Sequence, residues 1–317
     1  MHEPSLIEIK RAIPQHCFRS HAGWSLFFAG RALAFSALAA VLLYQLRLST
    51  AWGTHWVISV LYALLQGTLF WGLFTLGHDC GHGAFSRYPW VNWMVGNTLH
   101  TILLTPYEAW RLSHRSHHQH TGHRRKDEIF YPNPPYHHVA LTALLGVAWF
   151  LYLLLANVPG RRKAYHYYSP EFRQHWPALG ASFASILFFC IALLKTWSLP
   201  TLMVYYFAPL FVFASWLVVV TFLHHHHWDS NVPWYDDASW NVVRGALASV
   251  DRDYGWFVNH VTHHIELHQI HHLFPIIPHY HLPAATQAFR ARFPQLVHQA
   301  GRSNAWDFCS GVYAWSK

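Results

Sequence analysis

The sequence His268-Gln-Ile-His-His-Leu-Phe-Pro275 places three histidines at helical offsets of three and four residues. Residues separated by three or four positions lie on the same face of an α-helix, so these imidazoles can point toward one place. Two earlier stretches follow the same rule: His78-Asp-Cys-Gly-His82 and His114-Arg-Ser-His-His118. Together they predict a metal centre, because neutral imidazole binds iron, zinc, copper and nickel.

The number of histidines indicates two ions rather than one, since the three stretches supply eight imidazoles. A lone His-x-x-x-His pair would be an ordinary helix surface in a chain with 29 histidines among 317 residues. Three such clusters, each just outside an apolar run, are typical of a metal centre. A pair of iron ions that activates oxygen fits this set better than zinc, because no His-Glu-x-x-His motif supplies a general base. Structural zinc sites use four ligands, often cysteines.

The composition indicates a membrane protein. Hydrophobic residues make up 53% of the chain and charged residues 11%, against about 25% charged in soluble proteins. The net charge of +8 comes from Lys and Arg in loops beside apolar runs, which fits the positive-inside pattern and not a nucleic-acid partner. The four cysteines lie far apart without a C-x-x-C pair, so the spacing predicts neither a disulfide framework nor a thiolate metal site.

The apolar runs predict an all-α integral membrane protein with four transmembrane helices and one or two interfacial helices. Runs of about 20 apolar residues are long enough to cross a bilayer core of about 30 Å. An even number of spans must separate the first cluster from the third, so that all three clusters share one membrane face. Run 139–157 is therefore predicted to lie in the interface, and run 91–105 is predicted as re-entrant or interfacial because it is too short and broken to span. The four predicted spans are residues 24–46, 54–76, 177–196 and 200–222.

The rest of the chain is predicted to lie on the cytoplasmic side as part of a single domain, residues 1–317. Residues 1–22 are polar and lack the apolar segment of a signal peptide. Residues 228–317 are polar, rich in tryptophan and contain the third cluster. We expect them to form a histidine-rich helical cap that holds the di-iron site.

Four longer stretches resemble the membrane fatty acyl desaturase family, and most closely its methyl-end (Δ12 and ω3) members from plants and bacteria. The resemblance covers roughly residues 70–132 and 218–290. Carotenoid ketolases, carotenoid hydroxylases and alkane hydroxylases share the histidines but not the last two stretches. The four stretches are Gly77–Gly83, Trp110–His118 followed by Asp127-Glu128, Asp251-Arg-Asp-Tyr-Gly255, and His271–Tyr280.

The resemblance implies two non-haem iron ions as cofactors and O2 as co-substrate. The family also uses a histidine after the fourth span, which the pattern Leu223-His224-His225 assigns to His225, although any member of the run 224–227 could fill that position. The implied ligands are His78, His82, His114, His117, His118, His225, His268, His271 and His272.

Ligating imidazoles need acceptors for their second ring nitrogen, and several acidic residues lie near the clusters. His263 also matches a histidine of the family and is expected to have a supporting role. The predicted partners of the ligands are Asp79, Asp127, Glu128, Asp251, Asp253 and His263.

The implied reaction is O2-dependent insertion of a cis double bond toward the methyl end of a membrane-lipid acyl chain. The run His224–His227 resembles the ω3 subgroup more than the Δ12 subgroup. No His-Pro-Gly-Gly haem motif is present, so the resemblance implies a separate electron donor, ferredoxin or cytochrome b5, with its reductase. Two other hypotheses remain open: a di-iron hydroxylase or ketolase acting on a lipid or carotenoid, and a non-enzymatic membrane metal-binding or transport protein.

Overall fold

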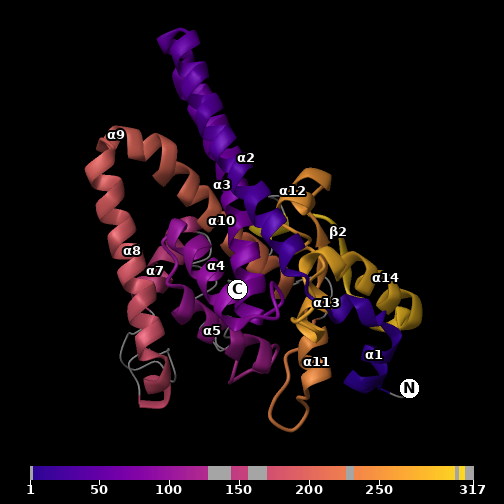
Figure 1. Ribbon diagram of the computed structural model, residues 1–317. Coiled ribbons are helices and arrows are strands. Elements are labelled where there is room, and N and C mark those ends of the chain that lie inside the picture. Colours follow the sequence, from indigo (N-terminus) through magenta and orange to yellow (C-terminus); the bar gives the residue numbers. More distant parts are fainter. Residues whose placement is uncertain (1–2, 128–143, 156–169, 226–231, 304–306, 311–317) are drawn as a thin grey trace.

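The computed structural model describes residues 3–127, 144–155, 170–225, 232–303 and 307–310, and these are mainly helical (Figure 1). Four helical segments are long and apolar enough to cross a membrane. They coincide with the four predicted spans. Each helical segment begins before its predicted start and ends at or beyond its predicted end. Their bounds are Ala22–Ser49, Trp52–His82, Arg173–Thr196 and Leu199–His225.

Along the chain, two hairpins of long helices are separated by short helices and followed by short helices and two strands. The elements are α1 (Leu6–Ala12), η1 (Gln15–Phe18), α2 (Ala22–Ser49), η2 (Trp52–Thr54), α3 (His55–His82), α4 (Pro89–Ile102), α5 (Tyr107–His120), α7 (Gly146–Leu155), η3 (Pro170–His175), α8 (Trp176–Thr196), α9 (Leu199–Leu202), the π-helical turn η4 (Met203–Phe207), α10 (Ala208–His225), α11 (Val242–Leu247), β1 (Asp251–Asp253), α12 (Trp256–Val261), α13 (His268–Leu273), η5 (His279–His281), α14 (Leu282–Arg292), η6 (Pro294–Leu296) and β2 (Gln299–Arg302).

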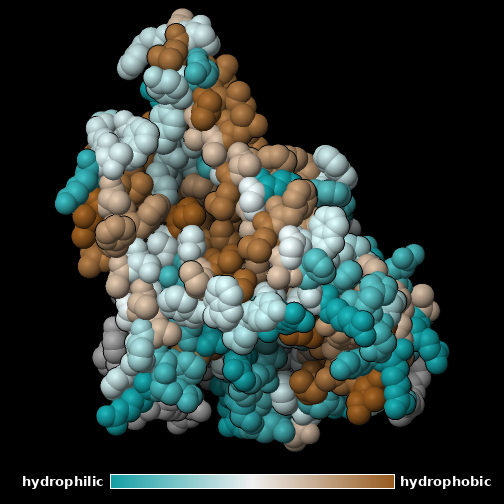
Figure 2. Space-filling model, in the orientation of Figure 1, coloured by the Kyte–Doolittle hydropathy of each residue, from teal (hydrophilic) through white to brown (hydrophobic). Residues whose placement is uncertain are grey.

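The distribution of exposed apolar side chains separates a lipid-facing half from a polar half. Trp52 and Trp56 at the tip of the α2–α3 hairpin are 84% and 70% exposed, and Phe188 on α8 is 75% exposed. Figure 2 shows hydrophobic residues over the upper helices and mostly hydrophilic residues over the lower body. Exposed apolar side chains that cover whole helices mark a surface that faces lipid or a partner.

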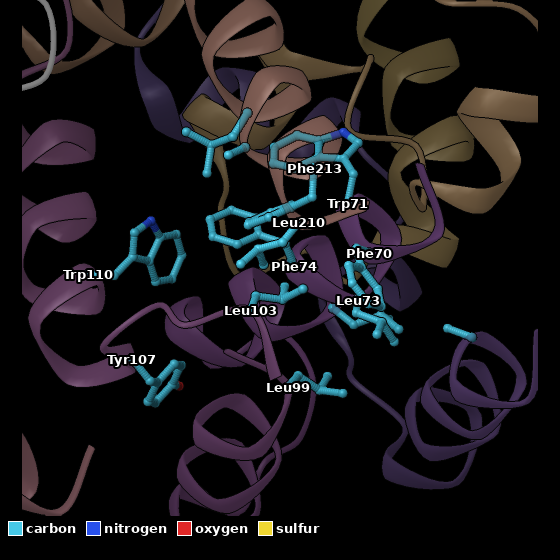
Figure 3. Close-up of a cluster of buried hydrophobic side chains, with 14 of the residues drawn as sticks. Phe70, Trp71, Leu73, Phe74, Leu99, Leu103, Tyr107, Trp110, Leu210 and Phe213 are labelled. Atoms are coloured by element: carbon cyan, nitrogen blue, oxygen red, sulfur yellow. The ribbon is translucent and has the colours of Figure 1, made fainter. Parts of the chain in front are cut away.

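Helix α3 forms the centre of the membrane half and is buried almost continuously from Tyr62 to Cys80. Helices α2, α4 and α10 pack around it. Figure 3 shows the aromatic cluster between α3 and α10, where Trp71 stacks on Phe74 and Phe74 contacts Phe213. Trp110 of α5 packs edge-on against Phe74 with ring centroids 5.2 Å apart. This aromatic core links the membrane helices to the lower body.

Helices α4 and α7 occupy the two regions predicted to be interfacial or re-entrant. Helix α4 has 14 residues and α7 has 10 described residues, or about 21 and 15 Å at 1.5 Å per residue. The length of α4 falls short of a bilayer core. Helix α4 packs on α3, and α7 packs on α10. The remainder of the predicted segment 139–157 lies outside the described residues.

The fold is mostly helical rather than all-α as predicted, because β1 and β2 pair in parallel. The stretch Asp251-Arg-Asp forms one of these strands, with backbone bonds that run from Asp251 N to His298 O and from Ser303 N to Asp253 O. Sequence periodicity does not reveal such short pairs, since their partners lie about fifty positions apart.

Residues 3–20 and 232–303, which we call the cap, lie with α5 below and beside the membrane helices, and α12 of the cap packs on α3 (Figure 1). The polar N-terminal segment is helical: Ser5 and Glu8 form a capping box at the start of α1. Its apolar side chains, Ile9 and Ile13, are buried against Leu282 and Phe289 of α14. Burial of each isoleucine stabilises this contact by roughly 1.5–3 kcal/mol. The N-terminal segment is therefore part of the cap rather than a free tail.

Candidate metal centre

Four helix ends meet beneath the membrane half and bring the nine predicted ligands together. Helix α3 carries His78 and His82 in its last turns and ends at Gly83, whose φ of 74° favours glycine. The second cluster lies on α5, the third on α13, and His225 is the last residue of α10. Each cluster is helical, as its spacing predicts.

Five of the imidazoles form one group, which we call the first group. The distances between Nε2 atoms are 3.3 Å for His78 and His82 and 3.0 Å for His114 and His118. His271 joins them with its Nε2 3.2 Å from that of His118. One ring nitrogen from each of the five lies within 4.8 Å of the others.

The remaining four imidazoles form the second group. Ring nitrogens of His117, His225 and His272 lie within 4.8 Å of one another. The Nε2 of His225 is 3.3 Å from that of His117 and 3.0 Å from that of His268. The Nε2 of His272 is also 3.0 Å from that of His268, so His268 belongs to this group.

Helical geometry explains how the clusters divide between the two groups. In α5, His114 and His118 are four residues apart and share the first group, whereas His117 turns toward the second. In α13 the assignment is reversed: His271 turns to the first group, while His268 and His272 lie side by side in the second. Adjacent residues of a helix are separated by about 100°, so a His-His pair cannot serve one ion and instead joins both.

The distances fit metal ligation. Nitrogen atoms bound at about 2.0–2.1 Å to one ion are separated by roughly 3.0 Å at right angles and roughly 3.4 Å at tetrahedral angles. The observed Nε2 separations of 3.0–3.3 Å fall in that interval. Burial also lowers the pKa of His114, His118 and His271 well below the ordinary value. These imidazoles are therefore neutral at pH 7 and offer lone pairs.

Hydrogen bonds at the second ring nitrogens fix which atom faces each group. The Nδ1–H of His117 donates to Oδ1 of Asp127 at 2.8 Å. The hydroxyl of Thr121 donates to the His117 carbonyl, so it can only accept from Nδ1–H of His272, 3.0 Å away. Both Nε2 atoms consequently carry lone pairs toward the second group. Lone pairs that face one another in this way suit a cation bound between them.

Two other predicted partners are Asp79 and His263. Asp79 lies beside a histidine of the first group, whereas His263 contacts residues outside both groups. Asp79 Oδ1 is 3.9 Å from Nδ1 of His78, and its Oδ2 accepts from Nδ1 of His279 at 2.9 Å. His263 contacts Thr75 through Nδ1 at 3.2 Å and packs against the His279 ring. The sequence does not identify His279 or Thr121 as supporting residues. His279 bonds Asp79 and Thr121 bonds His272, and both partners are distant in the sequence.

Asp251 and Asp253 act on the backbone rather than on an imidazole. Asp251 Oδ1 accepts from the backbone N–H of Gln269 at 2.8 Å and thereby anchors the start of α13; its Oδ2 accepts from Arg290 at 2.8 Å. Asp253 accepts from the Gly255 N–H and the Asn259 side chain. Glu128 lies outside the described residues.

Two histidines of the run 224–227 are described, His224 and His225, and of these two His225 belongs to the second group. His224 points away: its Nδ1 bonds the Val250 carbonyl, and its Nε2 lies 3.1 Å from the Tyr254 hydroxyl. Tyr254 belongs to the stretch Asp251–Gly255, so this stretch holds the end of α10 through His224. His226 and His227 lie outside the described residues.

Replacing Asp127 with asparagine tests the support of His117. The amide keeps one acceptor oxygen, whereas both Nδ1–H of His117 and the N–H of Gly122 need one. We expect metal affinity and activity to fall roughly 10–100-fold, as is typical when a partner of a ligating histidine is lost. Metal content and turnover of purified Asp127→Asn measure this.

The matched control is Asp237→Asn, since Asp237 is 44% exposed and contacts Lys126 at the surface and the buried ring of His123, which is not a predicted ligand. It should keep full metal content. Unchanged metal content and turnover in Asp127→Asn would show that this carboxylate does not support the centre.

Comparison with known proteins adds a family to this geometry. The fatty acid desaturase family model matches residues 54–301. A chloroplastic omega-3 fatty acid desaturase of Glycine max is 36% identical over 315 residues, which cover 95% of this chain and 68% of that protein. In Arabidopsis thaliana, a chloroplastic sn-2 acyl-lipid omega-3 desaturase (ferredoxin) is 37% identical over 90% of this chain and 65% of its own length. An endoplasmic-reticulum acyl-lipid omega-3 desaturase (cytochrome b5) of the same organism is 40% identical over 89% of this chain and 74% of its own length.

Proposed function

Because this chain belongs to the fatty acid desaturase family, we propose that it inserts a cis double bond at the omega-3 position of an acyl chain carried by a membrane lipid. The chain is an oxidoreductase of that family. The observation that carries the proposal is the division of nine histidines into two groups of five and four, each dense enough to bind one ion. The omega-3 names of the relatives support the position of the bond.

We propose that His78, His82, His114, His118 and His271 hold one iron ion, and that His117, His225, His268 and His272 hold the other. The bound iron pair would supply the oxidising power that removes two hydrogens from adjacent methylenes with O2 as the acceptor. Overall, O2 takes two electrons and two protons from the acyl chain. Two further electrons from a donor and two protons from solvent complete two waters.

The residues of the chain position and protect the reacting centre. Trp110 stacks on the His114 ring with centroids 4.7 Å apart and an interplanar angle of 18°, which fixes that ring. Asp127 and Thr121 hold the protons on Nδ1 and keep each Nε2 free for iron. Trp71, Phe74 and Phe213 belong to the buried aromatic core above the first group, and this apolar packing would keep water away from that side of the centre.

The cap and the donor complete the proposal. We treat residues 1–317 as one domain whose cap faces the cytoplasm, and ferredoxin or cytochrome b5 as the donor. Arg125 and Lys126 are exposed and contact Asp237. The Asp237 carboxylate therefore offsets part of the positive charge that this basic run would offer to an acidic electron donor. Labelling of the exposed Cys309 by an impermeant maleimide on intact cells or protoplasts would contradict the cytoplasmic placement.

The test is gas chromatography–mass spectrometry of fatty acids from a host that expresses the chain with a donor. Linoleate and oleate are fed separately. We expect a triene from linoleate with its new bond at the omega-3 position. A diene from oleate alone would assign a Δ12 desaturase, and a hydroxylated or ketone product would restore the hydroxylase or ketolase alternative, which the relatives do not favour.

A further inference from the structure

A separate cluster of donor atoms lies in the cap, where His16 and Cys17 of η1 meet His281 of η5. One ligand atom from each of these three residues lies within 4.8 Å of the other two. We propose that the three side chains bind a zinc-class divalent cation, distinct from the nine-histidine centre, which fastens the N-terminal segment to the cap. This site does not depend on the acyl substrate or on the iron centre.

The geometry of the cluster fits a tetrahedral cation. Zinc binds sulfur at about 2.3 Å and imidazole nitrogen at about 2.0–2.1 Å, which places tetrahedral S and N ligands roughly 3.6 Å apart. The Sγ of Cys17 lies 3.7 Å from Nε2 of His16. The rings of His16 and His281 meet edge-to-face with centroids 5.3 Å apart, so a nitrogen of each ring can turn toward the sulfur without a clash.

Neighbouring contacts hold η1 and η5 in place independently of a cation. The backbone N–H of His21 donates to the Tyr280 hydroxyl at 2.7 Å. Phe18 packs edge-on against Phe274 with centroids 5.4 Å apart. The donors are therefore arranged before a cation arrives, and binding does not have to order the chain, which favours affinity.

The donor chemistry selects a different cation from that of the iron centre. A thiolate with imidazoles suits zinc or another thiophilic ion, whereas the nine-histidine centre offers nitrogen ligands alone. Burial raises the pKa of the Cys17 thiol, but a coordinated thiol is deprotonated outright by the charge of the ion. His16 is exposed, which leaves a path for the cation and a position for water.

Apolar packing alone explains only part of the cluster. Cys17 is fully buried among Ile9, Ile13 and Phe289, where a small apolar side chain would pack equally well. Packing does not account for the imidazoles of His16 and His281, which come from opposite ends of the chain and lie beside this sulfur. The spacing of cysteines in the sequence argued against a thiolate site, because His281 is distant in sequence and becomes adjacent only through folding.

Cobalt titration of the purified full-length chain in detergent tests the proposal. Cobalt bound by a thiolate gives a sulfur-to-metal charge-transfer absorption that nitrogen ligands do not give, so cobalt in the nine-histidine centre is silent in this band. We expect one thiolate-bound cobalt per chain, displaced by zinc. Cys17→Ser should abolish the band, and His16→Ala should weaken cobalt binding about tenfold or more. Cys309→Ser, which alters an exposed cysteine, should leave the band intact.

The result is decisive even if Cys17→Ser does not fold, since His16 is exposed and its removal leaves the apolar cluster intact. No charge-transfer band in the wild-type chain would overturn the proposal. A band that persists in Cys17→Ser, or equal cobalt affinity in His16→Ala and the wild type, would also overturn it.

Discussion

His271→Ala is expected to abolish desaturation and to lower the amount of bound iron. The Nε2 of His271 lies 3.2 Å from that of His118 and closes the first group from the cap side. Its removal takes away the ligand through which α13 contributes to the first group. The loss should exceed the roughly 10–100-fold effect of losing a partner that only supports a ligand. Iron content and product formation by the purified variant measure both effects.

A control on α5 separates ligation from general loss of histidine. His120 lies two residues after His118, and its Nδ1 contacts the Ser116 carbonyl at 3.0 Å. His120→Ala should retain two irons and most of the activity. If His271→Ala kept both irons and normal turnover, His271 would not be a ligand.

Gly72→Ala is expected to destabilise the protein and reduce its activity by separating the cap from α3. A Cβ at Gly72 would lie 2.1 Å from the Val261 carbonyl oxygen. Because that atom belongs to the backbone, α12 would have to move as a unit. Overpacking of this kind costs about 1–3 kcal/mol or more. The shift would also break the contact between Thr75 and Nδ1 of His263.

Gly30→Ala is the matched control, since Gly30 also lies in a membrane helix but a Cβ there would meet no heavy atom within 4 Å. Thermal unfolding in detergent, followed by size-exclusion chromatography, should show a lower midpoint for Gly72→Ala and an unchanged or slightly higher one for Gly30→Ala. Equal midpoints for the two variants would refute the close approach of α12 to α3.

The sequence predicted the spans and eight of the nine histidines because both depend on local spacing, whereas His225 was implied only by the resemblance to the desaturase family. Twenty apolar residues define a membrane helix, and the offsets within His114–His118 define a helix face. The same offsets imply that His114 and His118 act together. They do not reveal that His271 joins these two, because that contact spans more than 150 residues and depends on how α13 packs.

The remaining features depend on side-chain contacts that local spacing does not reveal. Thr121 supports His272 only because its hydroxyl proton is already given to the His117 carbonyl. His224 and His225 are adjacent and chemically identical, and only the Val250 carbonyl and the Tyr254 hydroxyl distinguish them. The sequence predicts residues 1–22 only as a polar cytoplasmic segment, since the apolar residues Ile9 and Ile13 are too few to predict a buried helix face.

The most direct test of the two-ion centre is an anomalous difference map at the iron absorption edge, from crystals of the iron-loaded protein. The map should show two peaks, one enclosed by the five imidazoles of the first group and one by the four of the second. A single peak, or two peaks within one group, would contradict the assignment of the nine histidines to two ions.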